Sequence, residues 1–176
     1  MLFRSLALFL QFVSFSTAYG FTPIIAENLG ATDAEKGLVT TIYSLTAVIG
    51  ALANASLGKK YRLRGVLVGS FLLQGVLCAL LPFLGDIYLL YGVQIVLGFF
   101  RGMLLSLLMS LSIERVSPEK QGTAMGFFQA VYSVGMTVGP LFIGLVGDAA
   151  GLETGFVLTG AISVGIAAFA WRARLV

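Results

Sequence analysis

Long apolar stretches recur six times along the chain, each bounded by charged residues or by glycine and proline. A helix that crosses the hydrocarbon core of a bilayer needs about 20 predominantly apolar residues. Within each stretch the apolar residues run continuously and do not alternate with a period of two, which favours helices over the strands of a barrel. The predicted membrane spans are residues 5–25, 37–57, 65–84, 87–113, 123–146 and 154–171.

The first span also has features of a secretory signal peptide, because Arg4 lies near its start and small residues surround Ala18. The apolar run continues through residues 21–25, however, and five further spans follow it. We therefore interpret this segment as a membrane helix.

The amino-acid composition agrees with a bilayer as the solvent. Of the 176 residues 58% are hydrophobic and 11% charged, whereas soluble domains carry about 25% charged residues. The chain has no histidine and a single cysteine, which excludes a histidine-bound metal, a Ser-His-Asp triad and an internal disulfide. The spans also lack acidic residues and nucleophile–base pairs. We therefore predict no catalytic residue, no metal and no cofactor, and we do not expect an enzyme.

The basic residues indicate how the chain crosses the membrane. With a cytoplasmic N-terminus, nine lysine and arginine residues fall on the cytoplasmic side and only Lys36 on the outer side. This asymmetry predicts that both termini are cytoplasmic. The excess of positive charge therefore belongs to membrane topology and not to a nucleic-acid-binding face.

Two junctions between a loop and a helix resemble each other. The sequence DAEKG opens the second span and PEKQG the fifth, and in each a further glycine follows thirteen residues later, at Gly50 and Gly135. The offset of 85 residues covers three spans, an odd number, so the two units would lie inverted in the membrane. We predict an all-α integral membrane fold, a single bundle of six transmembrane helices built from two inverted three-helix repeats, about residues 1–85 and 86–176.

Polar and small residues line one face of several spans at helical spacing. The second span carries such a stripe from Thr40 to Asn54, and the fifth carries one from Met125 to Pro140. Such stripes form either contacts between helices or the wall of a water-accessible cavity. The stripes of the first, fourth and fifth spans include bulky polar side chains, which favours a cavity there.

Arg101 is the one charged residue inside a predicted span. It lies about 20 Å from either end of its helix, too far for the side chain to reach a membrane surface. A central arginine costs about 2.5–3.5 kcal/mol. Because no span contains a carboxylate, its partner is a neutral acceptor such as Gln94, Gln129 or Tyr132, an acid of another chain, or an anionic substrate group. Arg101 either locks helices together or lies in a transport path, and we favour the second role.

Three segments resemble transporters of the major facilitator superfamily. The run IERVSPEKQGTAMGFFQAVYSVGMTVGPLFIGLVGD is similar to their tenth-to-eleventh helix junction, and YGFTPIIAENLGATDAEKGLVTTIYSL to the start of their seventh and eighth helices. GMTVGP is similar to the family's Gly-x-x-x-Gly-Pro signature, and Arg101 with Gly102 loosely resembles its arginine motif. The loop ASLGKKYRLRG departs from the family motif, because Lys59 stands in place of an aspartate and Arg62 in place of a glycine, while Lys60 fits.

This resemblance covers nearly the whole chain and is to the C-terminal half of those transporters. It implies that the first and fourth spans line a central cavity, the second and fifth flank it, and the third and sixth face lipid. The implied substrate-path residues are Gln11, Ser14, Tyr19, Thr41, Ser44, Gln94, Arg101, Gln129, Tyr132 and Met136. The residues implied in helix packing or gating are Gly98, Gly102, Gly135, Gly139, Pro140, Lys59, Lys60 and Arg62.

The expected function is that of a transporter half in the cytoplasmic membrane, which moves a small solute by alternating access, in the efflux direction. The remaining half is either a missing N-terminal six-helix half, which we favour, or a second copy in a homodimer. The substrate class stays open between anionic or polar solutes, which suit Arg101, and amphipathic drugs, which suit the Met and Phe side chains around Gln129. The alternative is a six-helix assembly or scaffold protein without transport.

Overall fold

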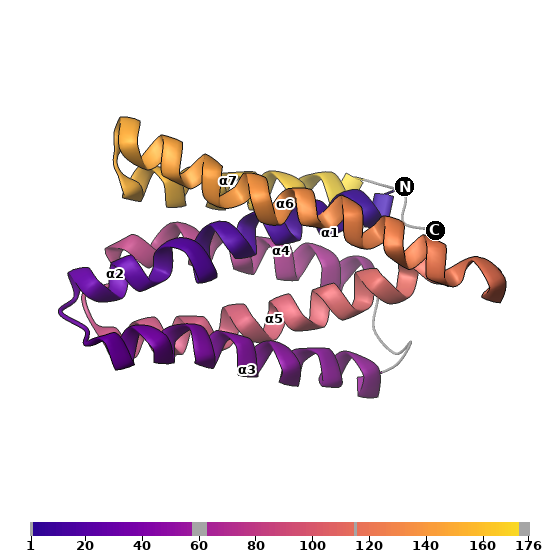
Figure 1. Ribbon diagram of the computed structural model, residues 1–176, viewed down its shortest axis with the longest axis horizontal. Helices are drawn as coiled ribbons and strands as arrows, with labels where there is room; N and C mark the ends of the chain where they lie inside the picture. The colour runs from indigo at the N-terminus through magenta and orange to yellow at the C-terminus, as the bar shows by residue number, and fades with distance from the viewer. Residues whose placement is uncertain (1, 58–62, 115, 173–176) are drawn as a thin grey trace.

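The computed structural model describes residues 2–57, 63–114 and 116–172, and this part of the chain consists of helices joined by short connections, without strands (Figure 1). In chain order the elements are α1 (Leu2–Ser14), the π-helix η1 (Phe15–Phe21), α2 (Thr22–Asn28), α3 (Asp33–Leu57), α4 (Leu63–Leu80), the 3-10 turn η3 (Leu81–Phe83), α5 (Ile87–Ile113), the 3-10 turn η4 (Pro118–Lys120), α6 (Gln121–Ala150) and α7 (Leu152–Arg172). Among the described residues six helical stretches are long and apolar enough to cross a membrane, which confirms the six predicted spans and the all-α class.

Most helices extend a few residues beyond the predicted spans, because apolar content locates the hydrocarbon core and not the caps. The second span was predicted to begin at residue 37, but α3 begins at Asp33. Its start is a reciprocal capping box, in which Thr32 N donates to Glu35 Oε2 at 2.8 Å and Glu35 N donates to Thr32 Oγ1 at 3.4 Å. The start of α5 is capped by Asp86, which accepts a hydrogen bond from Tyr88 N at 2.5 Å.

The first membrane helix is irregular in its middle, which the sequence pattern did not predict. Thr22 N bonds to Thr17 O, five residues back, and the Thr22 hydroxyl donates to the same oxygen at 2.7 Å. Pro23 follows directly and has no N–H to offer the preceding turn. The Thr17 carbonyl oxygen therefore accepts hydrogen bonds from both the backbone and the hydroxyl group of Thr22, in a turn wider than that of a regular α-helix.

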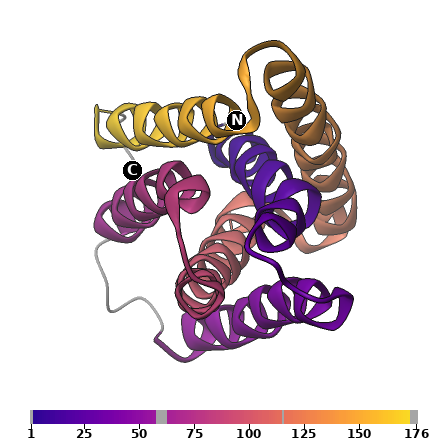
Figure 2. The same cartoon turned by 90° about the vertical axis from the view of Figure 1, so that its left-hand side faces the viewer.

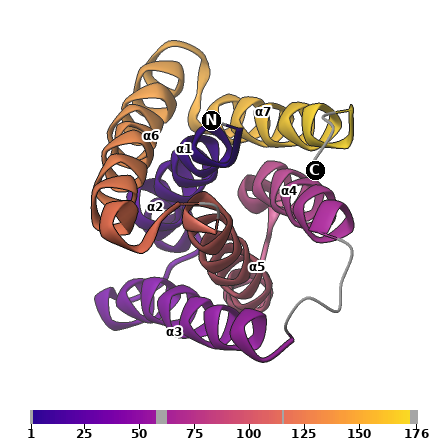
Figure 3. The same ribbon diagram turned by 90° about the vertical axis from the view of Figure 1, so that its right-hand side faces the viewer.

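The helices associate in three close pairs around a central contact. Seen from the two ends in Figures 2 and 3, α1 and α5 lie in the middle, α3 packs against α5, α6 packs against α1, and α4 and α7 form a pair that covers a third side. The resemblance implied this placement, with the first and fourth spans central and the second and fifth at their flanks.

Glycine permits the closest approach in each of these pairs. A Cβ at Gly102 of α5 would overlap the Ala47 carbonyl of α3, and one at Gly135 of α6 would overlap the Leu8 carbonyl of α1. In the third pair a Cβ at Gly160 would lie 2.5 Å from the carbonyl oxygen of Gly75. Lipid provides no hydrophobic driving force between helices, so van der Waals contact at such small residues holds the pairs together.

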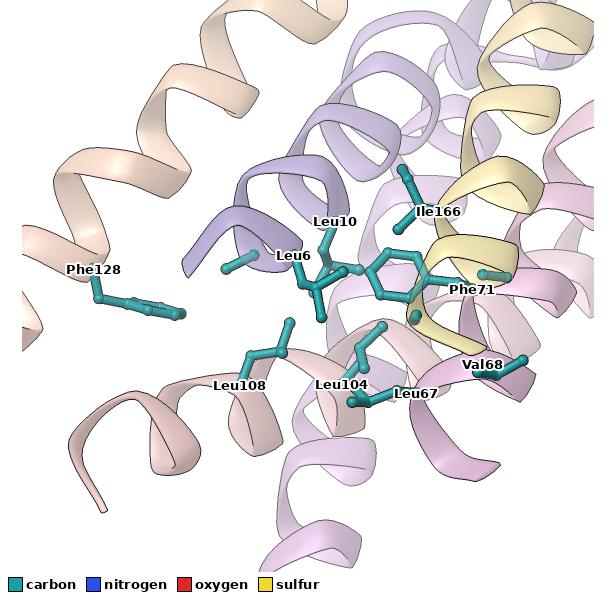
Figure 4. Packing of buried hydrophobic residues seen from close by; sticks show 12 residues of the cluster. Leu6, Leu10, Leu67, Val68, Phe71, Leu104, Leu108, Phe128 and Ile166 are labelled. Carbon is teal, nitrogen blue, oxygen red and sulfur yellow. The ribbon is translucent and has the colours of Figure 1, made fainter. Parts of the chain in front are cut away.

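Two apolar clusters fill the interior. The first cluster joins five helices near the start of α1 (Figure 4) and includes Leu6, Leu10, Leu67, Phe71, Leu104, Leu108, Phe128 and Ile166. The second cluster lies toward the other end of the bundle and includes Ala18, Ile25, Val39, Tyr43, Cys78, Leu81, Leu90, Leu97 and Phe156.

A polar layer separates the two clusters along the helices. We define it by the residues that lie between the two clusters on four helices: Gln11 and Ser14 on α1, Gln74 on α4, Arg101 on α5, and Thr159 and Ser163 on α7. All of them except Arg101, which is half-buried, are buried. The charge that the sequence places in mid-membrane therefore lies at the level where the interior is polar.

Candidate functional site

The site is built on Arg101, which lies half-way along α5. Its Nη2 donates a hydrogen bond to Oε1 of Gln11 on α1 at 3.2 Å. The acceptor is thus Gln11 and not Gln94, Gln129 or Tyr132, which we had named from the sequence. Because α1 and α5 run in opposite directions through the bundle, Gln11 comes to the depth of Arg101, whereas Gln94 lies about two turns away on α5 itself.

Three aromatic rings surround the guanidinium group. The Arg101 Cζ atom lies 5.6 Å from the ring centroid of Tyr19, 5.7 Å from that of Tyr43 and 5.9 Å from that of Phe15. The Tyr19 and Tyr43 rings meet edge to face at 5.5 Å. Cations within about 6 Å of an aromatic face are stabilised by the ring quadrupole. The rings and Gln11 thus stabilise the Arg101 side chain without an acidic neighbour; in the described part of the chain it has no ion-pair partner.

The irregular segment η1 supplies two of these rings, Phe15 and Tyr19. Tyr19 is 36% exposed, and its hydroxyl lies 3.1 Å from Oγ of Ser44 on α3. The Ser44 hydroxyl donates its own hydrogen to the Thr40 carbonyl oxygen at 2.8 Å, so the Tyr19 hydroxyl is the donor in their contact. This exposed hydrogen bond therefore connects η1 to α3 beside the guanidinium group.

Several polar atoms in and near this site have no hydrogen-bond partner within the described part of the chain. They include Arg101 Nε and both amide atoms of Gln94, which are buried. Leaving a buried polar group unpaired costs about 1–3 kcal/mol. Arg101 therefore still has hydrogen-bonding capacity that its surroundings within the bundle do not use.

Of the ten predicted substrate-path residues, the structure brings four together: Gln11, Tyr19, Ser44 and Arg101. Ser14 is buried in the polar layer. The others lie elsewhere. Thr41 is exposed and donates to the Gly37 carbonyl oxygen on its own helix.

Gln94 is fully buried on α5 between Leu90 and Leu97, which both belong to the second cluster. Three predicted residues are on α6. Gln129 is exposed, Met136 is half-buried, and Tyr132 packs on Phe128 with ring centroids 5.5 Å apart, beside the first cluster.

The predicted packing residues lie at helix contacts. Gly98 and Gly102 face α3, and Gly135 and Gly139 face α1. Pro140 lies inside α6, and a Cβ at Gly20 of η1 would contact its Cβ at 3.8 Å. Lys59, Lys60 and Arg62 lie outside the described residues.

Sequence reasoning missed Phe15 and Tyr43. Both are aromatic residues in otherwise apolar spans, and an aromatic ring in a span is more often part of the core than part of a cation site. The one available signal was the tyrosine, whose hydroxyl is polar at a depth where Arg101 also lies. Which aromatic residues meet Arg101 depends on how far α1 and α3 are shifted along α5, and that shift is set by the packing.

The chain is similar in sequence to several transport and drug-resistance proteins. It is 27% identical over 156 residues to the Multi-drug resistance efflux pump PmrA of Streptococcus pneumoniae, a match that covers 86% of this chain and 39% of the pump. It is 30% identical over 159 residues to the Multidrug resistance protein MdtG of Proteus mirabilis, with 88% of this chain and 39% of that protein covered. A shorter match, 32% identical over 92 residues, is to Monocarboxylate transporter 10 of Mus musculus.

These matches relate the chain to part of longer proteins, since it spans about two fifths of the length of the two bacterial relatives. The family model of the Major Facilitator Superfamily matches residues 4–176. Together with six helices able to span a membrane, this match identifies a multi-pass membrane protein of a transporter family. The chain belongs to the Major Facilitator Superfamily.

Proposed function

We propose that this chain is the C-terminal six-helix half of a secondary transporter that moves a small solute out of the cell by alternating access. The observation that carries this proposal is a permanent charge at mid-membrane depth, held by Gln11 and aromatic rings beside the partly exposed Tyr19. A charge kept at this depth is the mark of a substrate or ion pathway. The efflux direction follows the names of the bacterial relatives, which are efflux and multidrug resistance proteins.

The pairing of the helices supports two inverted repeats, residues 1–85 and 86–176. Exchanging α1 with α5, α3 with α6, and α4 with α7 turns the set of close pairs into itself. The glycines of the two similar junctions agree with this exchange: a Cβ at Gly50 of α3 would overlap the Phe99 carbonyl of α5, as one at Gly135 of α6 would overlap that of Leu8 in α1. Transport would then proceed by rocking of this bundle against a second one.

The exposed apolar faces of α3 and α6 support the proposal that a second bundle packs against this one. Leu45, Val48 and Leu52 of α3 are about 60% exposed, as are Leu141 and Leu145 of α6, on the two helices that flank α1 and α5. The proposed partner is the N-terminal six-helix half or, failing that, a second copy of this chain. In the cytoplasmic membrane both termini would face the cytoplasm, as the basic residues indicate.

A flux measurement tests the transport role. Cells or proteoliposomes that carry the chain with its partner half should lose most solute flux when Arg101 is replaced by Ala, while the amount of inserted protein stays the same. Lys120→Ala, which removes a positive charge outside the helices that cross the membrane core, is the matched control and should leave flux unchanged. Equal flux in Arg101→Ala and the wild type would contradict the proposal.

A non-transporting assembly protein is the second candidate, and one observation favours it. Arg101 contacts side chains from α1, η1 and α3, which is also what a residue that locks helices together would do. This role predicts that Arg101→Ala lowers the yield of folded protein and leaves partner binding and activity per folded molecule unchanged.

Water access separates the two roles. Ser44→Cys should react with a membrane-impermeant maleimide in at least one conformation if the face beside Tyr19 lines an aqueous path. Val76→Cys, on the exposed apolar face of α4 and away from the proposed contact with the second bundle, should not react. Cys78 is buried and contributes little background. Protection of Ser44→Cys under every condition would favour the assembly role.

A further inference from the structure

The hydrogen-bonding geometry of Arg101 says what kind of group it still requires. A guanidinium group has five N–H donors and no acceptor. Gln11 takes one donor of Nη2, and the buried Nε–H has no partner among the residues that the structure describes. The three rings stabilise the charge from 5.6–5.9 Å, and among the described residues Gln11 is the acceptor to which the guanidinium group donates. What is missing is an acceptor in the guanidinium plane.

The charge balance says how much negative charge the site can take. Arg101 is the one charged residue inside the six predicted spans, and no carboxylate of the described residues pairs with it. One positive charge in a low-dielectric layer matches one negative charge, whereas a dianion would leave a second charge buried without compensation. A carboxylate also fits the planar fork of a guanidinium in a bidentate manner.

One exposed hydrogen bond attaches the cover of the site to α3. Tyr19 is held over the guanidinium group by its exposed hydrogen bond to Ser44. The Tyr19 O–H is a donor, because Ser44 gives its own hydrogen to Thr40. If the ring turns away from Ser44, the same O–H can donate to an anion bound at Arg101. The rings of Tyr19 and Phe15 then lie beside the remainder of the ligand.

On this basis we infer that Arg101, Gln11 and Tyr19 form a binding site for an aromatic monocarboxylate, with the carboxylate at the guanidinium group and the ligand ring beside Tyr19 and Phe15. The inference deepens the proposed transport function and rests on it for its physiological meaning. It narrows the solute from any polar or amphipathic compound to a monoanion.

A direct binding assay with a labelled ligand tests this site in native membrane extracts that contain the full chain. Labelled benzoate is the probe, and benzylamine and phenyl phosphate are added at pH 8 as test competitors. Benzoate should bind saturably, benzylamine should not compete, and the dianionic phenyl phosphate should compete only weakly. Competition by benzylamine or phenyl phosphate as strong as that by unlabelled benzoate would overturn the inference, as would the absence of saturable benzoate binding.

Two variants probe the same atoms in different ways. Arg101→Gln removes the charge and should weaken benzoate binding about thirtyfold or more. Gln11→Glu replaces the side-chain amide, whose Oε1 lies 3.2 Å from Arg101 Nη2, with a carboxylate. An ion pair between residues 11 and 101 should then take the place of the ligand. We expect this variant to fold at least as stably as the wild type and to lose benzoate binding to a similar extent.

The matched control is Asn28→Asp, which adds one carboxylate at the exposed end of α2, away from the site. It should bind benzoate like the wild type. If Gln11→Glu, folded by its thermal unfolding curve, binds benzoate as tightly as Asn28→Asp does, the inference is wrong.

Failure of this inference is distinguishable from failure of the transport proposal. If a cationic or neutral solute is transported in an Arg101-dependent manner but benzoate does not bind, the anion site is wrong and transport stands. If benzoate binds with the expected dependence on Arg101 and Gln11 while no solute is moved, the site stands and transport is wrong.

Discussion

The α4–α7 pair and the group formed by α1, α3 and α5 are both stabilised by helix contacts in mid-membrane, but by different means. Between α4 and α7 the contacts are small and neutral: Gly75 faces Gly160, and the Ser163 hydroxyl donates to the Phe71 carbonyl oxygen at 2.8 Å. Between α1, α3 and α5 a charge is held by an amide and three rings. The first arrangement maximises contact, while the second keeps a costly group in place.

Under the proposed function, the α4–α7 pair has a structural role and the α1–α3–α5 group a chemical one. In the α4–α7 pair the Ser163 hydroxyl reaches an acceptor and the backbones touch. Ser70 Oγ and Gln74 Nε2 of α4 are nevertheless buried without a hydrogen-bond partner among the described residues, so unpaired polar atoms occur in both regions. What distinguishes the α1–α3–α5 junction is the charge of Arg101, the irregular η1 and the partly exposed Tyr19. Irregular π-turns inside helices are frequent at functional sites.

The largest effect is expected from Gly160→Leu in the α4–α7 pair. A side chain there would collide with the Gly75 backbone, so the pair must separate, and we expect a loss of about 4 kcal/mol or more of unfolding free energy. Gly165→Leu, on an exposed part of the same helix where an added Cβ meets nothing within 4 Å, should be tolerated. Thermal unfolding in detergent measures both, and equal stability of the two variants would refute the close contact.

A somewhat smaller loss, about 2–3 kcal/mol, is expected for Gly102→Ala in the α3–α5 pair. The added methyl group overlaps the Ala47 carbonyl, and α3 must move away from Arg101. Gly92→Ala, in an exposed position of the same helix, is the control and should be neutral or slightly stabilising. If the cluster around Arg101 is functional, Gly102→Ala should also reduce solute flux per folded molecule.

Replacing the Arg101–Gln11 pair by two leucines should raise stability while abolishing function. Substituting a buried polar or charged pair with apolar residues often stabilises a protein by about 1–4 kcal/mol, and we expect a gain of about 1–3 kcal/mol here. Unfolding curves and flux of the double variant Arg101→Leu/Gln11→Leu test this. A double variant that is less stable than the wild type would mean that the charge has a structural role.

The smallest effect is expected from Ser163→Ala, which removes the hydrogen bond between α7 and α4. Interhelical hydrogen bonds in membranes average about 0.6 kcal/mol, so the unfolding midpoint should shift only slightly and flux should not change. Ser133→Ala, which removes a hydrogen bond inside α6, gives the reference. A loss of flux with Ser163→Ala would show that the α4–α7 pair also takes part in transport.

How much was predictable differs between the fold and the site. The six spans follow from the sequence because the bilayer requires about 20 apolar residues per crossing, and charges end each run. The glycine contacts were predictable in kind, since small residues four apart on one helix face favour close packing. The partner of Arg101 was not, because the candidates named from the sequence included Gln94 on the same helix and Gln129 on α6, and neither is its hydrogen-bond partner.

The sequence by itself determined that this is a membrane protein with one charge at mid-depth and no acid to pair with it, because composition fixes the solvent and the solvent makes that charge costly. Only the tertiary structure decided that Gln11, Phe15, Tyr19 and Tyr43 surround the charge. The depth of these residues in the membrane and the direction of their side chains depend on how the helices shift and rotate against one another. The glycine contacts and the irregular turn of η1 set this shift and rotation. Local sequence does not encode either of those quantities on its own.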